Sequence, residues 1–85
     1  MNFKEYLEES KYKFPKDVEF KKATSKQIKS GENYTIIDIK NKAILKDNLQ
    51  YSSAKNAVDT IDDENIIFGD SAFIYDKYIS KWNKH

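Results

Sequence analysis

The stretch YTIIDIKNKAIL, residues 34–45, decides the fold because it predicts two neighbouring strands and the turn between them. Residues 34–39 are the most strand-like run of the chain, rich in Tyr, Thr and Ile. A second apolar run at 43–45 follows after three polar residues. Asn41 tolerates a positive φ and is therefore the expected corner of this hairpin.

A helix is expected directly downstream of the hairpin. Ser52 and Ser53 are residue types that cap helix N-termini, and the helix would then run over residues 54–61. Its apolar stripe has i, i+3, i+4, i+7 spacing and consists of Ala54, Ala57, Val58 and Ile61. The two alanines allow this helix to lie close to a sheet.

The C-terminal part of the chain predicts one more strand and one more helix. Residues 66–68 are a short apolar run, and Asp70 or Ser71 can cap the helix that follows it. One side of that helix carries Tyr75, Tyr78, Ile79 and Trp82, broadened by Phe73 and Ile74. We expect Tyr75 and Ile79 to close the core, whereas Trp82 can pack at an edge or anchor a partner.

The N-terminal part predicts a helix and then a strand. Asn2 can cap a helix with an apolar face, and Pro15 ends that helix by residue 14. Val18 and Phe20 alternate with charged residues, which predicts a short strand. A single helical turn is then expected from a cap at 24 or 25 to Gly31.

The expected order of elements is therefore α, β, (short α), β, β, α, β, α. This order predicts one α+β domain over residues 1–85, with a small, mainly antiparallel sheet of three or four strands packed by two or three helices. The chain has no cysteine, so aromatic side chains, 14% of the residues, are expected to supply much of the core. No stretch is long and apolar enough to predict a membrane span, and no apolar signal segment opens the chain, so a cytoplasmic location is expected.

Charge is distributed unevenly along the chain, although the net charge is only +1. Residues 1–46 carry eleven lysines and seven acids, whereas residues 47–85 carry four lysines and seven acids. A basic face and an acidic face can therefore meet different partners. The chain has no arginine, so we expect no sequence-specific reading of a nucleic-acid duplex.

The basic segment, residues 11–29, is a candidate contact for single-stranded RNA. Its lysines can approach phosphates and its aromatic rings can stack on bases. The candidate residues are Lys11, Lys13, Lys16, Lys21, Lys22, Lys26, Lys29 and Tyr12. The alternative is that Phe14 and Phe20 face the core while the lysines are only solvated, and this alternative is the commoner one.

The acidic run after the predicted helix is a candidate contact for a basic partner. Asp62, Asp63 and Glu64, with Asp59, lack the ligand spacing of a metal-binding loop, so we predict no metal site. Their simplest interpretation is a solvated helix end. Acids at a helix C-terminus oppose the helix dipole, however, which favours a partner-facing role.

Catalysis lacks its usual residues in this sequence. The one histidine is His85, there is no cysteine, and the two glycines form no phosphate-binding loop. We therefore expect no enzyme activity and no cofactor.

The first ten residues, MNFKEYLEES, resemble the opening of small proteins of T4-like tailed phages. Some of these carry a capsid-targeting segment that is removed after a Leu/Ile-x-Glu site, and residues 7–9, Leu-Glu-Glu, fit such a site. The run from residue 34 to residue 61 is similar in style to hairpin-plus-helix units of such proteins. The resemblance implies an accessory anti-host, anti-defence or capsid-targeted role in the host cytoplasm.

Three functions remain open on this basis. The first is a binding protein that inhibits or redirects a host protein, such as a defence toxin or nuclease, with or without RNA in the complex. The second is a single-stranded RNA-binding module that uses the Lys11–Lys29 segment. The third is a packaged virion component. A homo-oligomer is compatible with each of them.

Overall fold

The computed structural model describes residues 14–16 and 18–82. Their order is α2 (Ser25–Ser30), β1 (Tyr34–Asp38), β2 (Ala43–Leu49), α3 (Tyr51–Ile61) and β3 (Ile66–Asp70). The chain then forms one continuous helical segment from α4 (Ser71–Ile74) through a π-helical turn, η1 (Tyr75–Ile79), to α5 (Ser80–Trp82). The expected α+β class is confirmed. The helix predicted from Asn2 lies outside the described residues.

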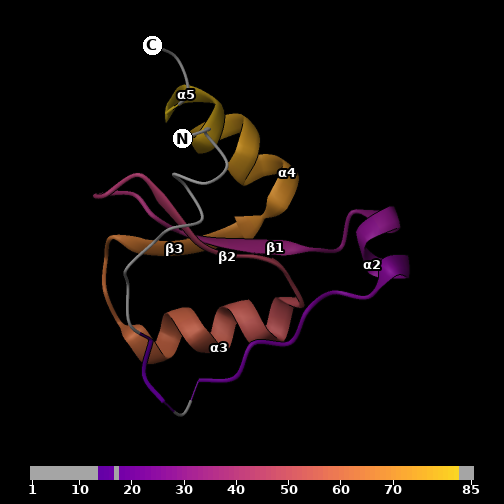
Figure 1. Ribbon diagram of the computed structural model, residues 1–85, viewed down its shortest axis with the longest axis horizontal. Helices are drawn as coiled ribbons and strands as arrows, with labels where there is room; N and C mark the ends of the chain where they lie inside the picture. The colour runs from indigo at the N-terminus through magenta and orange to yellow at the C-terminus, as the bar shows by residue number, and fades with distance from the viewer. Residues whose placement is uncertain (1–13, 17, 83–85) are drawn as a thin grey trace, which may run out of the picture.

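The sheet has three antiparallel strands in the order β2-β1-β3. Figure 1 shows α3 below this sheet and the helical segment from α4 to α5 above it. Because β1 is central and both of its faces are covered, four consecutive residues, 35–38, are buried. The predicted hairpin of residues 34–45 is thus the centre of a three-layer structure.

Each face of the sheet has its own apolar core. Ile36 belongs to the core between the sheet and α3, together with Leu49 and Ile66, and is fully buried. Ile37 points to the opposite face, where it packs with Ile74 and Ile79 of the C-terminal helical segment. This division follows from the two-residue period of a strand, which sends neighbouring side chains to opposite faces.

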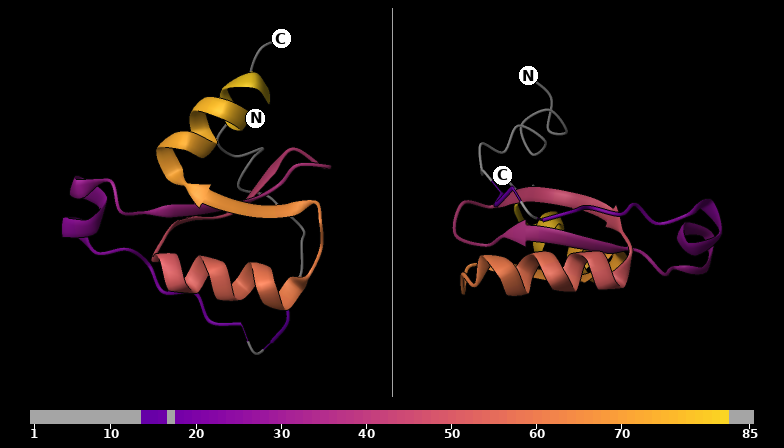
Figure 2. Two further views of the ribbon diagram at one scale, coloured as in Figure 1. Left: turned by 180° about the vertical axis from the view of Figure 1, so that it is seen from behind. Right: turned by 90° about the horizontal axis from the view of Figure 1, so that it is seen from below.

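The short helix α2 has the ends that the sequence predicts. The Thr24 side chain accepts a hydrogen bond from the Gln27 N–H, and Gln27 returns one to the Thr24 N–H, which makes a complete capping box. Gly31 ends α2 with φ of 83°, a left-handed conformation that glycine adopts without steric cost. Figure 2 shows α2 standing away from the sheet, at the end where β1 begins.

Four details differ from the sequence predictions. Residues 18–20 are not a strand, because only Lys22 bridges to β2, at Leu49. The positive φ of the hairpin turn falls on Lys42, while Asn41 instead donates a hydrogen bond to Asp38.

The other two differences concern helices. Gln50, not Ser52 or Ser53, is the N-cap residue of α3, which therefore begins at Tyr51. Tyr75 is 43% exposed and does not close the core, because Ile74 and Ile79 occupy that side of the helical segment.

Candidate functional surface

Three aromatic rings form a cluster beside the N-terminus of α3. We call Tyr34, Tyr51 and Phe68 the aromatic cluster. The ring centroids of Tyr34 and Tyr51 lie 5.1 Å apart, those of Tyr51 and Phe68 5.7 Å, and those of Tyr34 and Phe68 6.3 Å. These tilted arrangements are favourable for aromatic rings. Tyr34 and Phe68 are half-buried on the sheet, whereas Tyr51 is 51% exposed and forms the outer surface of the cluster.

Tyr51 was not predicted as a contact residue, although its position in the sequence indicates that it belongs to the apolar face of α3. Tyr51 lies three residues before Ala54 and seven before Val58, so it extends the apolar stripe of α3 by one turn. Its place in the first turn of α3 leaves half of the ring exposed. Trp82, for which the sequence left open packing at an edge or anchoring a partner, is half-buried against the core that contains Ile79.

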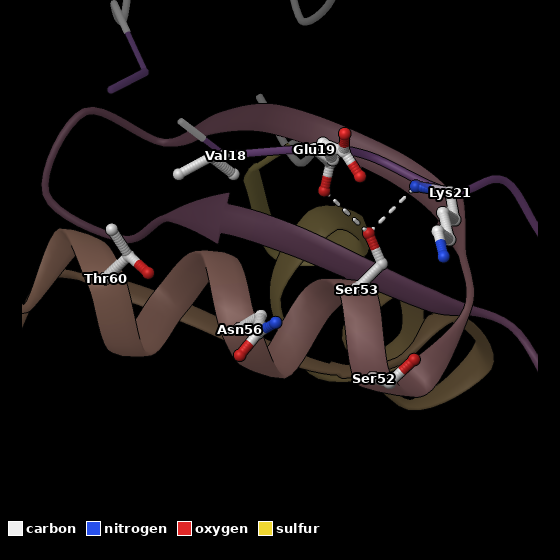
Figure 3. A pocket seen from close by; sticks show the side chains of 7 residues that line it. All are labelled: Val18, Glu19, Lys21, Ser52, Ser53, Asn56 and Thr60. Atoms are coloured by element: carbon white, nitrogen blue, oxygen red, sulfur yellow. Dashed lines mark hydrogen bonds between the residues drawn. The ribbon is translucent and has the colours of Figure 1, made fainter. Parts of the chain in front are cut away.

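A polar hollow of about 280 Å³ lies between α3 and the segment before α2 (Figure 3). Ser53 is the buried hydroxyl in it: its Oγ accepts a hydrogen bond from the Lys21 N–H at 2.8 Å and donates one to the Glu19 carbonyl at 3.1 Å. Both bonds hold the segment on α3. The Ser53 proton is donated to a backbone carbonyl, which is too weak a base to remove it, so this contact does not activate the hydroxyl as a nucleophile.

The described lysines of the basic segment are exposed, whereas its described aromatic residues are not free to stack on bases. The exposed lysines are Lys16, Lys21, Lys22, Lys26 and Lys29. Phe14 and Phe20 contact each other, with 4.7 Å between ring centroids, and pack on the core between the sheet and α3. Lys22 also lies 3.6 Å from the Asp47 carboxylate, which neutralises part of its charge. The remaining predicted RNA contacts, Lys11, Tyr12 and Lys13, lie outside the described residues.

The predicted acidic contact lies at the C-terminal end of α3. Asp62, Asp63 and Glu64 are exposed there, and Asp62 is the C-cap in a left-handed conformation with φ of 52°. Asp59 is paired separately: its carboxylate accepts a hydrogen bond from Lys55 Nζ at 2.8 Å, and this bond raises the pKa of Lys55. The remaining three acids therefore carry most of the negative charge at this helix end.

Substituting Asp62 separates the stability of this helix end from its charge. We expect Asp62→Gly to raise the free energy of unfolding by about 0.5 to 1 kcal/mol, because glycine adopts a positive φ without strain and the substitution removes an acid from the negative end of the helix dipole. Asp63→Gly is the matched control. It should destabilise the fold, because Asp63 accepts a hydrogen bond from the Asn65 N–H at 2.9 Å. Urea denaturation followed by circular dichroism measures both, and a destabilising Asp62→Gly would contradict the prediction.

Within residues 14–16 and 18–82, no three His, Cys, Asp or Glu side chains are grouped so that they could hold a metal ion. Among the helices of the same residues, none has the length and apolarity needed to cross a membrane. Comparisons with protein-family models, curated proteins and solved structures found no match. The fold and surface therefore define only a class: a small three-layer α+β protein with an exposed aromatic cluster and an acidic helix end.

Proposed function

We propose that this chain is a non-enzymatic binding protein that docks on another protein. In the phage interpretation of its first ten residues, the target is a host protein, such as a defence toxin or nuclease, that is inhibited or redirected. The observation that carries the proposal is the aromatic cluster, whose Tyr51 ring is half exposed on a rigid base of Tyr34 and Phe68. Tyrosine supplies a large contact area at a small cost in conformational entropy, and it is enriched among the residues that dominate binding energy.

The acidic helix end complements the aromatic cluster. Tyr51 begins α3 and Asp62 caps its end, so the two are separated by about 16 Å along a helix of this length. A target that fits this surface has an apolar pocket for the Tyr51 ring and a basic patch about one helix length away. Opposite charges would speed the encounter, and the buried ring would slow dissociation.

The polar side chains of the described core have structural hydrogen-bond partners, which favours a binding function over a catalytic one. Thr35 and Ser71 are bonded to each other, Ser53 to two backbone groups, and Asp38 to Asn41 and the Lys40 N–H. In the described residues, no buried side-chain nitrogen or oxygen lacks a hydrogen-bond partner. Each of these groups thus has a structural partner that accounts for its burial.

The proposal is tested by photocrosslinking from position 51. With p-benzoylphenylalanine in place of Tyr51, we expect a specific adduct with one host protein, and we expect Tyr51→Ala to lower retention of that protein at least tenfold. Phe73→Ala is the matched control, because Phe73 is equally exposed, at 52%, but lies on α4 outside the cluster. No adduct, or equal loss of retention with both alanine variants, would refute the assigned surface.

The RNA-binding alternative depends on the exposed lysines alone, because Phe14 and Phe20 are packed on the core. Titration with labelled single-stranded RNA at two salt concentrations tests it directly. The virion alternative depends on residues 7–10, outside the described part of the chain, and mass spectrometry of purified virions tests it. Both stay predictions.

A further inference from the structure

The two edges of the sheet are treated differently by the fold. The outer edge of β2 is covered near its end by residues 21–23. The Ala23 N–H donates to the Asn48 carbonyl at 2.8 Å, the Gln50 N–H donates to the Lys21 carbonyl at 2.9 Å, and Lys22 bridges to Leu49. The exposed part of β2 carries Lys46 and Asp47, and its pairing with β1 is irregular. Charges and bulges of this kind discourage another strand from adding to an edge.

The outer edge of β3 is regular and carries one charge, Asp70 at its C-terminal end. Residues 66–69, Ile-Ile-Phe-Gly, contain no charge and no proline, and β3 pairs with β1 in five consecutive partners without a bulge. In the part of the chain that the structure describes, no segment pairs with this outer edge. A regular edge with a single terminal charge and no covering strand is a template for a further strand.

The register identifies which backbone groups point outward from β3. The Ile39 N–H donates to the Asn65 carbonyl and the Ser71 N–H donates to the Asn33 carbonyl, both at 2.9 Å. Both are hydrogen-bonded positions of the antiparallel ladder, and such positions alternate along a strand. Ile67 and Gly69 therefore face β1, whereas Ile66, Phe68 and Asp70 turn their backbone groups outward.

Two of the six outward groups are already used. The Ile66 N–H donates to the Asp63 carbonyl at 2.9 Å, and the Asp70 carbonyl belongs to the first turn of α4, for which Asp70 is the N-cap. The unused groups are two donors, the N–H groups of Phe68 and Asp70, and two acceptors, the carbonyls of Ile66 and Phe68.

We propose that a second copy of this chain pairs with β3 through its own β3, antiparallel, about a two-fold axis at Phe68. In this register the two Phe68 residues exchange N–H and carbonyl groups. The Asp70 N–H of each copy donates to the Ile66 carbonyl of the other. Every unused donor then meets an unused acceptor, giving four hydrogen bonds and a continuous six-stranded sheet. A closed two-fold contact of this kind uses the same surface on both subunits.

The same register predicts how the dimer responds to salt. It places Asp70 of one copy opposite Ile66 of the other, beside the turn that carries Asp63 and Glu64, which the Ile66 N–H closes by donating to the Asp63 carbonyl. These like charges repel at low ionic strength, so added salt should strengthen the dimer. Association between the basic N-terminal half of one copy and the acidic C-terminal half of another would instead weaken with salt.

The test uses the full chain, with its mass followed by light scattering up to millimolar concentration and its amide exchange followed by NMR. We expect a dimer in which the Phe68 amide becomes protected with rising concentration. N-methylation of Phe68 removes the outward donor but leaves its ring and the β1 ladder, and should raise the dimer dissociation constant about tenfold or more. N-methylation of Ser52, in the first turn of α3 where N–H groups lack helical acceptors, is the control and should leave it unchanged.

Protected amides of Ile67 and Gly69 in the methylated chain would show that β3 is still folded on β1. A monomer at every concentration would overturn the proposal, as would a dimer that weakens with salt or leaves the Phe68 amide unprotected. Protection of Phe68 only after a target protein is added would also overturn it, and would assign the edge to a strand of that target.

Discussion

Replacing Ile37 with alanine is expected to lower the free energy of unfolding by about 3 kcal/mol. Ile37 is fully buried between the sheet and the C-terminal helical segment, where it packs with Ile44, Ile74 and Ile79. The substitution removes buried methyl and methylene groups and leaves a cavity that an interior strand cannot close. Because a domain of this size has only about 5 to 10 kcal/mol of stability, the loss is a large fraction of the total.

Ile36→Ala is the companion substitution on the other face of β1. Ile36 is equally buried, but it packs in the core between the sheet and α3. Similar losses for both variants would show that the two helical layers stabilise the sheet to a comparable extent. Ile28→Ala is the control and should cost less than about 0.5 kcal/mol, because Ile28 is 45% exposed on α2.

Chemical denaturation at a constant denaturant slope measures all three variants. A loss below about 1 kcal/mol for Ile37→Ala, with the usual loss for Ile36→Ala, would mean that the segment from α4 to α5 is not packed on the sheet as described.

The elements that the sequence predicted well are those in which local chemistry and burial agree. The run at 34–39 has strand propensity and is buried on both faces as β1, so both effects favour the same conformation. Thr24 and Gly31 fix the ends of α2 by hydrogen bonding and by backbone conformation, which need no tertiary partner. Asp70 likewise accepts from the Ala72 and Phe73 N–H groups, as its position before a helix predicts.

The predictions failed where tertiary contacts decide between similar local signals. Val18 and Phe20 alternate like a strand, but the Ser53 hydroxyl holds the neighbouring backbone at Glu19 and Lys21 on α3 instead of in the sheet. The same bonds explain why Ser53 is not a cap: it faces inward from the first turn of a helix that already began at Tyr51.

The candidate surface was harder to predict than the fold for the same reason. Tyr51 and Trp82 are both aromatic residues near the end of a helix. The neighbouring sequence gives no indication of which of the two is covered by the rest of the chain. The structure shows that Trp82 packs on the core of the C-terminal segment, whereas Tyr51 contacts Phe68 and Tyr34 with only part of its ring and leaves half of it exposed. Exposure of an aromatic residue is thus a property of element placement.

The buried hydroxyl pair of Thr35 and Ser71 is expected to show strong coupling. The two oxygens lie 2.7 Å apart, Thr35 is fully buried in β1, and Ser71 begins α4 at 8% exposure. Thr35→Val leaves the Ser71 hydroxyl buried without its partner, and Ser71→Ala does the same to Thr35. Each single variant should therefore lose about 2 kcal/mol, since an unsatisfied buried hydroxyl keeps its full desolvation cost.

The double variant Thr35→Val with Ser71→Ala should lose less than the sum of the two single losses, by about 1 to 2 kcal/mol, because it leaves no orphaned polar group. A double-mutant cycle by denaturant unfolding measures this coupling energy. The pair Ser30→Ala with Ser80→Ala is the control, since both hydroxyls are exposed and bond only to backbone carbonyls of their own helices. Additive losses for Thr35 and Ser71 would show that their bond does not join β1 to α4 in solution, and the attachment of the C-terminal layer would then rest on its apolar contacts alone.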